Sequence, residues 1–224
     1  MIDFRKFKGI IFDLDGTLID SMGVWERIDV DFLGKRGYEV PNDYLDKITP
    51  MGFEACAVYT KERFNLKETP KEIIEEWYSM AIDAYTNVVK TKPGVKKFLD
   101  YLRIHNVKMA IATASDNALV IPALKNNGIS EYFENITTVK EANRGKGFPD
   151  VYDLAANKMG LNNTECAVFE DIYEGMKGAK MGGYLTVGVY EKSCITCEEK
   201  LREMCDIFIH DFSECIINDC EKVV

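Results

Sequence analysis

The amino-acid sequence predicts an α/β fold, in which a parallel sheet has helices on both faces and carries a helical insertion. An apolar run at residues 10–12 ends in acidic residues, as a buried strand would. Residues 22–90 contain several helical patterns and no convincing strand. From residue 91 onward, helical and strand-like segments alternate, which is typical of parallel strands joined by right-handed crossovers. The helical block is therefore predicted to be inserted into one core that begins before it.

The first predicted strand leads directly to two acidic residues. Residues 10–12 are all apolar, which suits a strand covered on both faces. Asp13 and Asp15 follow, and carboxylates are costly inside a core, so they should emerge at the carboxyl end of the strand. Open α/β sheets bind their ligands at that edge. Two carboxylates there can hold a divalent cation, and one of them can attack an electrophile.

The block after this strand predicts a small helical bundle. Val24, Ile28 and Phe32 recur at every fourth residue and give one helix an apolar face. Thr69 and Glu72 form a capping-box pattern with Pro70 between them, which marks the start of another helix.

The rest of the chain predicts alternating helices and strands. Helices are expected to begin at Pro93, near Asp116, at Pro149 and at residue 173. Strands are expected at 107–112, 136–139, 167–169, 185–189 and 207–209, the last as an edge strand. Pro122 is expected to kink or split the helix that begins near Asp116.

Size and charge narrow the functional classes. A chain of 224 residues can bury one core with a smaller insertion. Its net charge of -9 argues against nonspecific binding to nucleic acid or to an anionic membrane surface. No apolar run approaches the roughly 20 residues of a membrane helix, and residues 1–8 lack the apolar core of a signal peptide. A cytoplasmic location is expected, and no prediction is made for the oligomeric state.

The cysteine pattern does not predict a disulfide framework. The chain has seven cysteines, an odd number, in a chain large enough to fold without disulfides. Cys194 and Cys197 form a Cys-x-x-Cys pair, and a zinc site with Cys205 and His210 is conceivable. Reduced thiols are the preferred interpretation, because strong zinc signals pair two such motifs.

Polar residues also follow three later segments of the predicted sheet. They are Thr113 with Ala114 and Ser115, Lys146 in the loop before Pro149, and Glu170 with Asp171. If their strands neighbour the first strand, these positions converge on one crevice. Several carboxylates suit a hard cation, and a hydroxyl, a lysine and that cation suit a phosphoryl group. No Gly-x-x-x-x-Gly-Lys-Ser/Thr loop is present, which disfavours that class of nucleotide triphosphatase.

In order and spacing, these segments resemble the four motifs of the haloacid dehalogenase superfamily, in the subgroup with a helical cap inserted after the first motif. The matching segments are Asp13–Leu18, Thr113, Lys146 with Pro149 and Asp150, and Glu170–Asp171 with Gly175. The resemblance covers nearly the whole chain. It implies a Rossmann-like parallel sheet core formed by residues 1–19 and 91–224, and a helical cap domain at residues 20–90. The linkers at 16–21 and 89–93 are the expected hinges.

The resemblance also implies a role for each site residue. Asp13 resembles the nucleophile that forms an aspartyl-phosphate, and Asp15 resembles the general acid and base. Asp13, the backbone carbonyl of Asp15, and Asp171 resemble the ligands of Mg²⁺. Glu170 is expected either to bind Mg²⁺ through water or to orient Lys146. Thr113 and the Ala114 amide would bind phosphoryl oxygens, and Lys146 would offset the charge of the nucleophile and the phosphoryl group.

These expectations favour a Mg²⁺-dependent phosphatase whose substrate is a small phosphorylated metabolite, either a sugar phosphate or a nucleoside monophosphate. Relatives that cleave carbon–halogen or carbon–phosphorus bonds lack an aspartate at the position of Asp15. The alternative is a β-phosphoglucomutase-like isomerase. It is disfavoured because this chain has Met51 and Phe53 where relatives often carry arginine or lysine. A non-catalytic binding or regulatory protein on the same fold is the third possibility.

Overall fold

The computed structural model describes residues 3–48, 51, 53–192 and 195–217. The chain divides into two compact units, one formed by Met1–Ser21 and Lys90–Val224 and the other by Met22–Val89. The first unit contains the sheet, and the second is helical throughout its described secondary structure. None of the described helices is both long enough and apolar enough to cross a bilayer.

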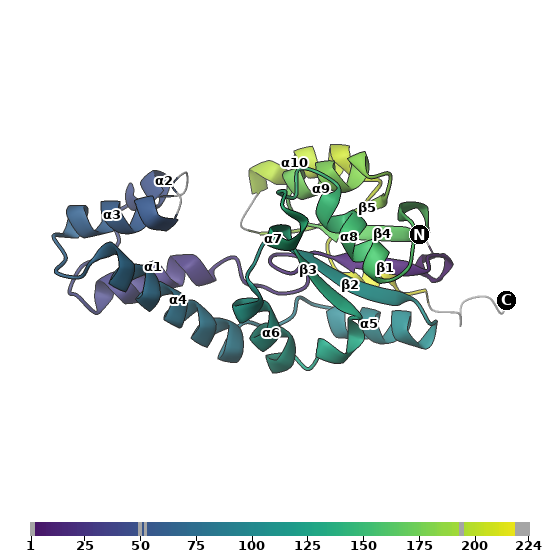
Figure 1. Ribbon diagram of the computed structural model, residues 1–224, viewed down its shortest axis with the longest axis horizontal. Coiled ribbons are helices and arrows are strands. Elements are labelled where there is room, and N and C mark those ends of the chain that lie inside the picture. The colour runs from purple at the N-terminus through teal and green to yellow at the C-terminus, as the bar shows by residue number, and fades with distance from the viewer. Residues whose placement is uncertain (1–2, 49–50, 52, 193–194, 218–224) are drawn as a thin grey trace. The chain divides into compact units, whose positions relative to one another are not determined.

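Six parallel strands form one sheet in the order β3-β2-β1-β4-β5-β6 (Figure 1). The strands are β1 (Gly9–Phe12), β2 (Lys108–Thr113), β3 (Asn135–Thr138), β4 (Cys166–Glu170), β5 (Leu185–Val189) and β6 (Ile207–Ile209). This sheet confirms the predicted α/β class, and β6 lies at an edge as expected. Because β1 pairs with β2 and β4, the carboxyl ends of all three strands meet at one edge.

The two faces of the sheet pack against different layers. Ile11 belongs to a core with the apolar face of helix α8 (Asp150–Lys158), and Phe12 points to the opposite face because side chains alternate along a strand. The Phe12 ring lies 5.0 Å from the ring of Phe169 and 6.2 Å from that of Phe98. Burial on both faces explains why β1 reads as an unbroken apolar run.

The helices of this unit cover both faces (Figure 1). They are α5 (Val95–Ile104), α6 (Asn117–Asn126), α7 (Val139–Ala142), α8 (Asp150–Lys158), α9 (Tyr173–Met181) and α10 (Ile195–Met204). Short 3-10 turns are η1 (Phe4–Lys6), η2 (Ser130–Tyr132), η3 (Asn163–Glu165) and η4 (Phe212–Cys215). The prediction that Pro93 begins a helix is wrong by two residues, because Gly94 takes a left-handed conformation (φ +77°) and α5 starts after it.

The helix expected near Asp116 is present as α6, and Pro122 does not split it. One helix runs through it from Asn117 to Asn126. Proline removes a single backbone donor, and the tertiary contacts of the helix offset that loss. The buried side chains around it are Leu119, Val120, Ala123 and Leu124.

The helical unit is held by its own apolar core. Its helices are α1 (Val24–Gly34), α2 (Tyr44–Ile48), α3 (Phe53–Phe64) and α4 (Pro70–Asn87). The rings of Phe32 and Trp77 lie 5.4 Å apart and join α1 to α4. The predicted capping box is confirmed, since Glu72 accepts the Thr69 N–H at 2.7 Å while Thr69 accepts the Glu72 N–H.

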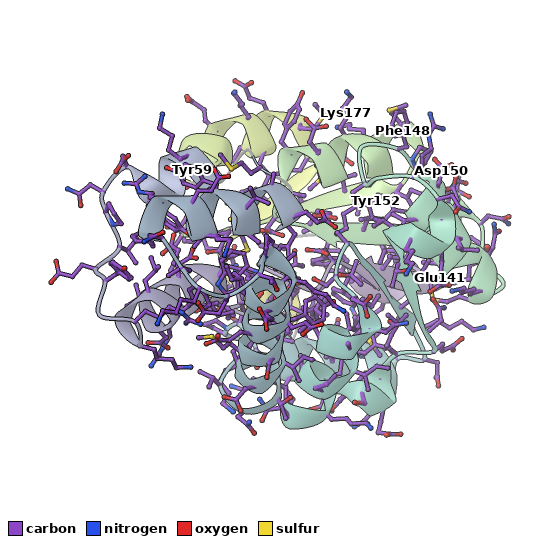
Figure 2. The ribbon with its side chains drawn as sticks, turned by 60° about the vertical axis from the view of Figure 1, so that its left-hand side comes forward. Tyr59, Glu141, Phe148, Asp150, Tyr152 and Lys177 are labelled. Atoms are coloured by element: carbon purple, nitrogen blue, oxygen red, sulfur yellow. The ribbon has the colours of Figure 1, made fainter. Side chains whose placement is uncertain are left out.

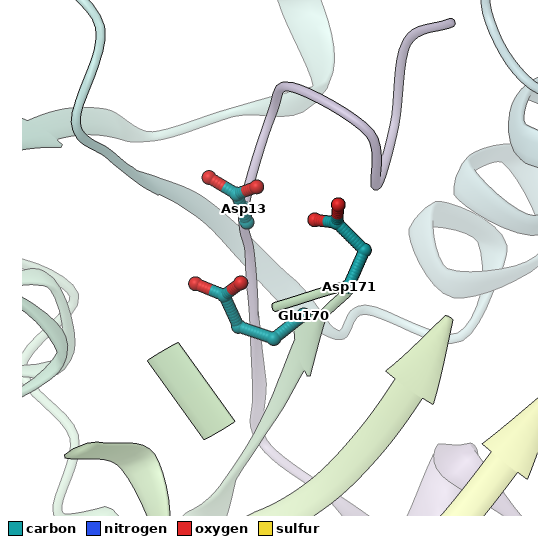
Figure 3. A group of neighbouring side chains, drawn as sticks. All are labelled: Asp13, Glu170 and Asp171. Atoms are coloured by element: carbon teal, nitrogen blue, oxygen red, sulfur yellow. The ribbon is translucent and has the colours of Figure 1, made fainter. Parts of the chain in front are cut away.

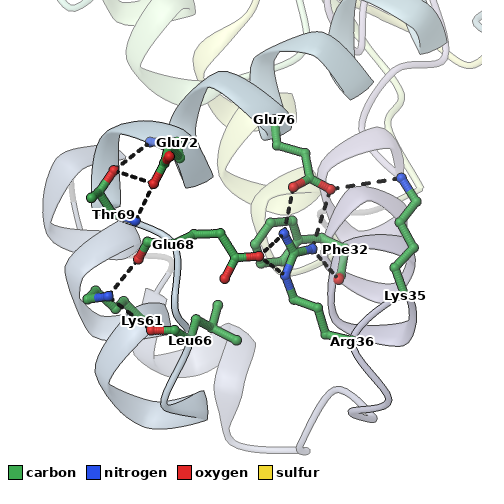
Figure 4. Close-up of polar contacts among 9 residues, drawn as sticks. All are labelled: Phe32, Lys35, Arg36, Lys61, Leu66, Glu68, Thr69, Glu72 and Glu76. Carbon is green, nitrogen blue, oxygen red and sulfur yellow. Dashed lines mark hydrogen bonds and ion pairs between the residues drawn. The ribbon is translucent and has the colours of Figure 1, made fainter.

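Arg36 anchors the polar side of this bundle (Figure 4). It donates to Glu68 at 2.7 Å and to Glu76 at 2.6 Å, and its guanidinium lies 3.7 Å from the centre of the Phe32 ring. Planar stacking and paired carboxylates are the contacts in which arginine differs most from lysine. Arg36, which follows α1, therefore ties the end of that helix to the segment before α4 and to α4 itself.

Asp29 is an acidic residue inside the same bundle. Its side chain is buried, and burial together with the charge of Glu26 raises the pKa of its carboxyl to about 6. A carboxyl in this state is partly protonated near neutral pH.

Candidate active site

Three carboxylates converge where β1 and β4 end (Figure 3). Asp13 follows β1, Glu170 ends β4, and Asp171 comes next. One oxygen from each lies within 4.8 Å of the others, and all three side chains are buried. The parallel register places Phe12 beside Phe169, so the residues that follow each strand must also be neighbours. The structure thus brings Asp13 against two adjacent residues that lie more than half the chain away in sequence.

Lys146 completes this cluster with a positive charge. Its ammonium donates to Oδ1 of Asp13 and to Oε1 of Glu170, the latter at 2.5 Å. Burial lowers the pKa of Lys146, but the charges of Asp13 and Glu170 outweigh burial and raise that pKa above its usual value. Gly178 of α9 permits the approach, because a Cβ there would lie 2.0 Å from the Lys146 carbonyl oxygen.

The acidic side chains carry more negative charge than one lysine offsets. Burial raises the pKa of Asp13 well above its ordinary range, although Lys146 opposes that effect. Burial and the charge of Glu170 raise the pKa of Asp171 to about 7, against the hydrogen bond from Thr17. A further cation at this position would favour the ionised carboxylates.

The oxygen atoms of the cluster fit a divalent metal ion. Oε2 of Glu170 is buried and has no hydrogen-bond partner among the described residues. A buried oxygen without a partner is rare, and a cation is one of the few groups that would satisfy it. Carboxylate ligands alone suit a hard cation such as Mg²⁺. Asp13, Glu170 and Asp171 could therefore hold such an ion.

Asp15 is held at the rim of the cluster by two hydroxyl groups. Ser21 donates to Oδ1 and Ser115 donates to Oδ2, each at 2.6 Å. Thr113 ends β2 and is fully buried, and its hydroxyl accepts the Ser115 N–H at 3.0 Å. Ala114 follows β2 directly and is exposed. The end of β2 is thereby linked to the acidic residue after β1.

The turn after β1 contributes contacts to which the sequence alone assigned no role. Thr17 donates its hydroxyl to Oδ1 of Asp171 at 2.8 Å. Gly16 has a φ of +78°, and a Cβ there would lie 2.2 Å from Oδ2 of Asp171. Both residues belong to the Gly-Thr turn, whose fixed position after Asp15 is the signal that could have indicated them.

Lys92 supports the same turn from a distant part of the chain. Its ammonium donates to the Gly16 carbonyl and, at 2.6 Å, to the Tyr190 carbonyl, and it pairs with Glu191 at 2.7 Å. Nearby backbone bonds join Asp20 N–H to the Lys90 carbonyl and Lys92 N–H to the Leu18 carbonyl, both at 2.9 Å. No local sequence pattern indicates these contacts, because they join residues far apart in the chain.

Half of the conceivable zinc site falls on side chains that the structure does not describe. Cys194 and the Cys197 side chain lie outside the described part of the chain, whereas Cys205 has a free thiol. Within the described residues, the one group suited to a metal is the carboxylate cluster.

Comparison with known proteins identifies similar sequences across most of the chain. The model of the family described as "Haloacid dehalogenase-like hydrolase" matches residues 10–189. Protein YhcW of Bacillus subtilis is 28% identical over 190 residues, which cover 83% of this chain and 84% of YhcW. Fructose-1-phosphate phosphatase YqaB of Escherichia coli is 27% identical over 195 residues, which cover 83% of this chain and 98% of YqaB.

Comparison with solved structures supports the fold. A crystal structure from Thermotoga maritima matches with a TM-score of 0.83 at 19% identity, covering 93% of this chain and 96% of that one. At this identity the match bears on the fold alone.

Proposed function

We propose a phosphate-ester hydrolysis for this chain, on the premise that it belongs to the haloacid dehalogenase-like hydrolase family, whose model spans residues 10–189. The observation that carries the proposal is the buried group of Asp13, Lys146, Glu170 and Asp171, with an unpartnered oxygen on Glu170. It combines a nucleophile, a fixed positive charge and oxygen ligands at one point. We assign this site to a phosphatase that acts on a small phosphorylated metabolite.

Asp13 and Asp15 would carry the two chemical steps. An Asp13 oxygen attacks phosphorus, the phosphorus–oxygen ester bond breaks, and the Asp15 carboxyl donates a proton to the leaving oxygen. Asp15 then takes a proton from water, whose oxygen attacks phosphorus and releases inorganic phosphate from Asp13. The bonds from Ser21 and Ser115 support this role, because they fix the orientation of the Asp15 carboxylate.

Thr113, Ala114 and Lys146 would bind the phosphoryl group. The Thr113 hydroxyl and the Ala114 amide lie at the end of β2, where they can donate to phosphoryl oxygens. Lys146 would offset charge on Asp13 and on the transferred group, and this effect is strong because the lysine is buried. Catalysis would then rest mainly on positioning and charge neutralisation.

Asp13, Glu170 and Asp171, with the Asp15 backbone carbonyl, are the residues assigned to hold Mg²⁺. When bound, Mg²⁺ neutralises charge that develops on the phosphoryl oxygens. Thr17 orients Asp171 through its hydroxyl, and Lys146 orients Glu170 through Oε1. Oε2 is the Glu170 oxygen without a hydrogen-bond partner among the described residues.

A sugar phosphate is the proposed substrate class. The name of YqaB, a fructose-1-phosphate phosphatase, supports this choice at 27% identity. Met51 and Phe53 oppose the mutase alternative, because neither side chain can bind the second phosphate of a bisphosphate intermediate through a charge.

The test is a phosphate-release screen over sugar phosphates and nucleoside monophosphates with Mg²⁺, together with NMR of glucose phosphates. Phosphate release from sugar phosphates, abolished by EDTA and restored by Mg²⁺, is the expected result. Isomerisation without release would favour the mutase, and silence in both assays would favour a binding protein.

Asp13→Asn and Asp153→Asn form a matched pair for this test. Both remove one negative charge, but Asp153 lies on α8 and accepts a hydrogen bond from Tyr184 at 2.7 Å. We expect Asp13→Asn to abolish turnover with an unchanged circular dichroism spectrum, and Asp153→Asn to stay active. Full activity of Asp13→Asn would refute the nucleophile assignment.

A further inference from the structure

Tyr152 places a buried hydroxyl against the acidic cluster. The residue lies on α8 (Figure 2) and is completely buried. Its hydroxyl donates to Oε1 of Glu170 at 2.7 Å and lies 3.1 Å from the Gly175 carbonyl. Burial, followed by the charge of Glu170, raises the pKa of Tyr152 well above its ordinary range, so the group stays a neutral donor.

The two oxygens of Glu170 are used unequally. Oε1 accepts from both Lys146 and Tyr152, whereas Oε2 is buried and has no hydrogen-bond partner among the described residues. Two donors on one oxygen define the rotation of the carboxylate. With only Lys146 as donor, the carboxylate could turn and offer either oxygen to the ammonium.

Gly175 of α9 also packs closely against this carboxylate. A Cβ at Gly175 would lie 2.5 Å from both Cδ and Oε1 of Glu170 and 2.7 Å from Oε2. Gly175 thus lets the backbone of α9 close over the carboxylate, while Tyr152 holds it from α8. Glu170 is confined between two helices.

We infer that Tyr152 is a positioning residue, which fixes Glu170 so that Oε2 remains available to the divalent cation. The inference rests on the proposed function, because it takes the cation site as given. Tyr152 does not touch the ion or the substrate in this scheme. It acts through the orientation of Glu170, as hydrogen-bond partners of metal ligands do.

Tyr152→Phe and Tyr184→Phe make a matched pair of variants. Each removes one hydroxyl from a buried tyrosine that donates to a carboxylate, and the two rings lie 6.3 Å apart. The hydroxyl of Tyr184 contacts Asp153 rather than Glu170. Mg²⁺ binding to the metal-free enzyme is measured by calorimetry, and kcat is measured over a range of Mg²⁺ concentrations.

We expect Tyr152→Phe to weaken Mg²⁺ binding by about 10-fold, and Tyr184→Phe to bind like wild type. At saturating Mg²⁺, the kcat of Tyr152→Phe should recover most of the wild-type value. Unchanged Mg²⁺ affinity in Tyr152→Phe would overturn the inference and leave the proposed function standing. A wild-type enzyme that binds no Mg²⁺ would overturn both.

Gly175→Ala provides a second route if Tyr152→Phe does not fold. Its added methyl group would collide with the same carboxylate while the tyrosine hydroxyl is kept. Weakened Mg²⁺ binding in a folded Gly175→Ala protein would support control of Glu170 orientation, whereas wild-type affinity would contradict it.

Discussion

Replacing Lys146 with methionine removes the positive charge of the acidic cluster while keeping a side chain of similar length. The Lys146–Glu170 pair, at 2.5 Å, attracts by about 7 kcal/mol at an effective dielectric constant of about 20. Desolvation of the buried ions offsets part of that energy. Removing one partner of a buried pair costs about 3–5 kcal/mol, and we expect the metal-free Lys146→Met protein to lose stability in that range.

The same change should slow turnover by about 10²- to 10³-fold, the usual effect of deleting one group that stabilises developing charge. Urea unfolding without metal measures the stability loss, and phosphate release at saturating Mg²⁺ measures turnover. Lys180→Met is the matched control, because Lys180 pairs with Asp206 at 3.1 Å on the surface. An exposed pair of this kind contributes about 0–1 kcal/mol.

Two outcomes would refute this reasoning about Lys146. One is a Lys146→Met enzyme that keeps more than a tenth of wild-type turnover, which would remove the lysine from charge neutralisation. The other is a stability loss no larger than that of Lys180→Met, which would mean that the buried contacts contribute no more than a surface pair.

Three further predictions concern other parts of the molecule. Gly16→Ala should weaken Mg²⁺ binding in calorimetry, since its Cβ would lie 2.2 Å from Oδ2 of Asp171. The left-handed backbone at this position adds about 1–2 kcal/mol of strain to an alanine. Wild-type Mg²⁺ affinity would contradict this prediction. Lys92→Met should lower the free energy of unfolding by about 3 kcal/mol, because it breaks the buried pair with Glu191. Urea titration measures this loss of stability, and Lys180→Met again serves as the control for an exposed ion pair. Asp29 has a folded pKa of about 6, above the unfolded value, so its contribution to stability is complete below pH 4 and is lost as pH rises through 6. In urea unfolding from pH 4 to 8, the wild type should therefore lose about 2 kcal/mol more stability than Asp29→Asn, and equal slopes for the two proteins would refute this.

Local patterns predicted most of the sheet, because each strand is short, apolar and bounded by polar residues. The bounds of β5 and β6 agree with the expectation, as does the start of α9. For α6, only the possible split at Pro122 is wrong, since propensity alone does not include the packing that supports this helix. Gly94 shifted the start of α5, because the sequence does not reveal that its backbone is left-handed.

The acidic cluster was predictable for a different reason. Asp13 and Asp171 follow neighbouring parallel strands, so strand order alone brings them to one edge. The supporting contacts were not predictable in the same way. Tyr152 and Lys92 reach partners 18 and 98 residues away, respectively, and neither stands in a pattern that marks a polar contact. Such contacts depend on side-chain direction in the folded molecule, which a single sequence does not specify.

The backbone bonds between residues 18–20 and 90–92 close the base of the long excursion between β1 and β2. Because these bonds hold the two ends of the insertion together, the insertion imposes little strain on the sheet. Lengthening a loop whose ends are already held together adds little entropic cost. The paired segments 18–20 and 90–92 would therefore accept a different inserted domain, or a short glycine linker in place of residues 22–89. Such an exchange would keep the sheet unit and its acidic cluster constant while evolution, or an engineer, replaces the helical unit.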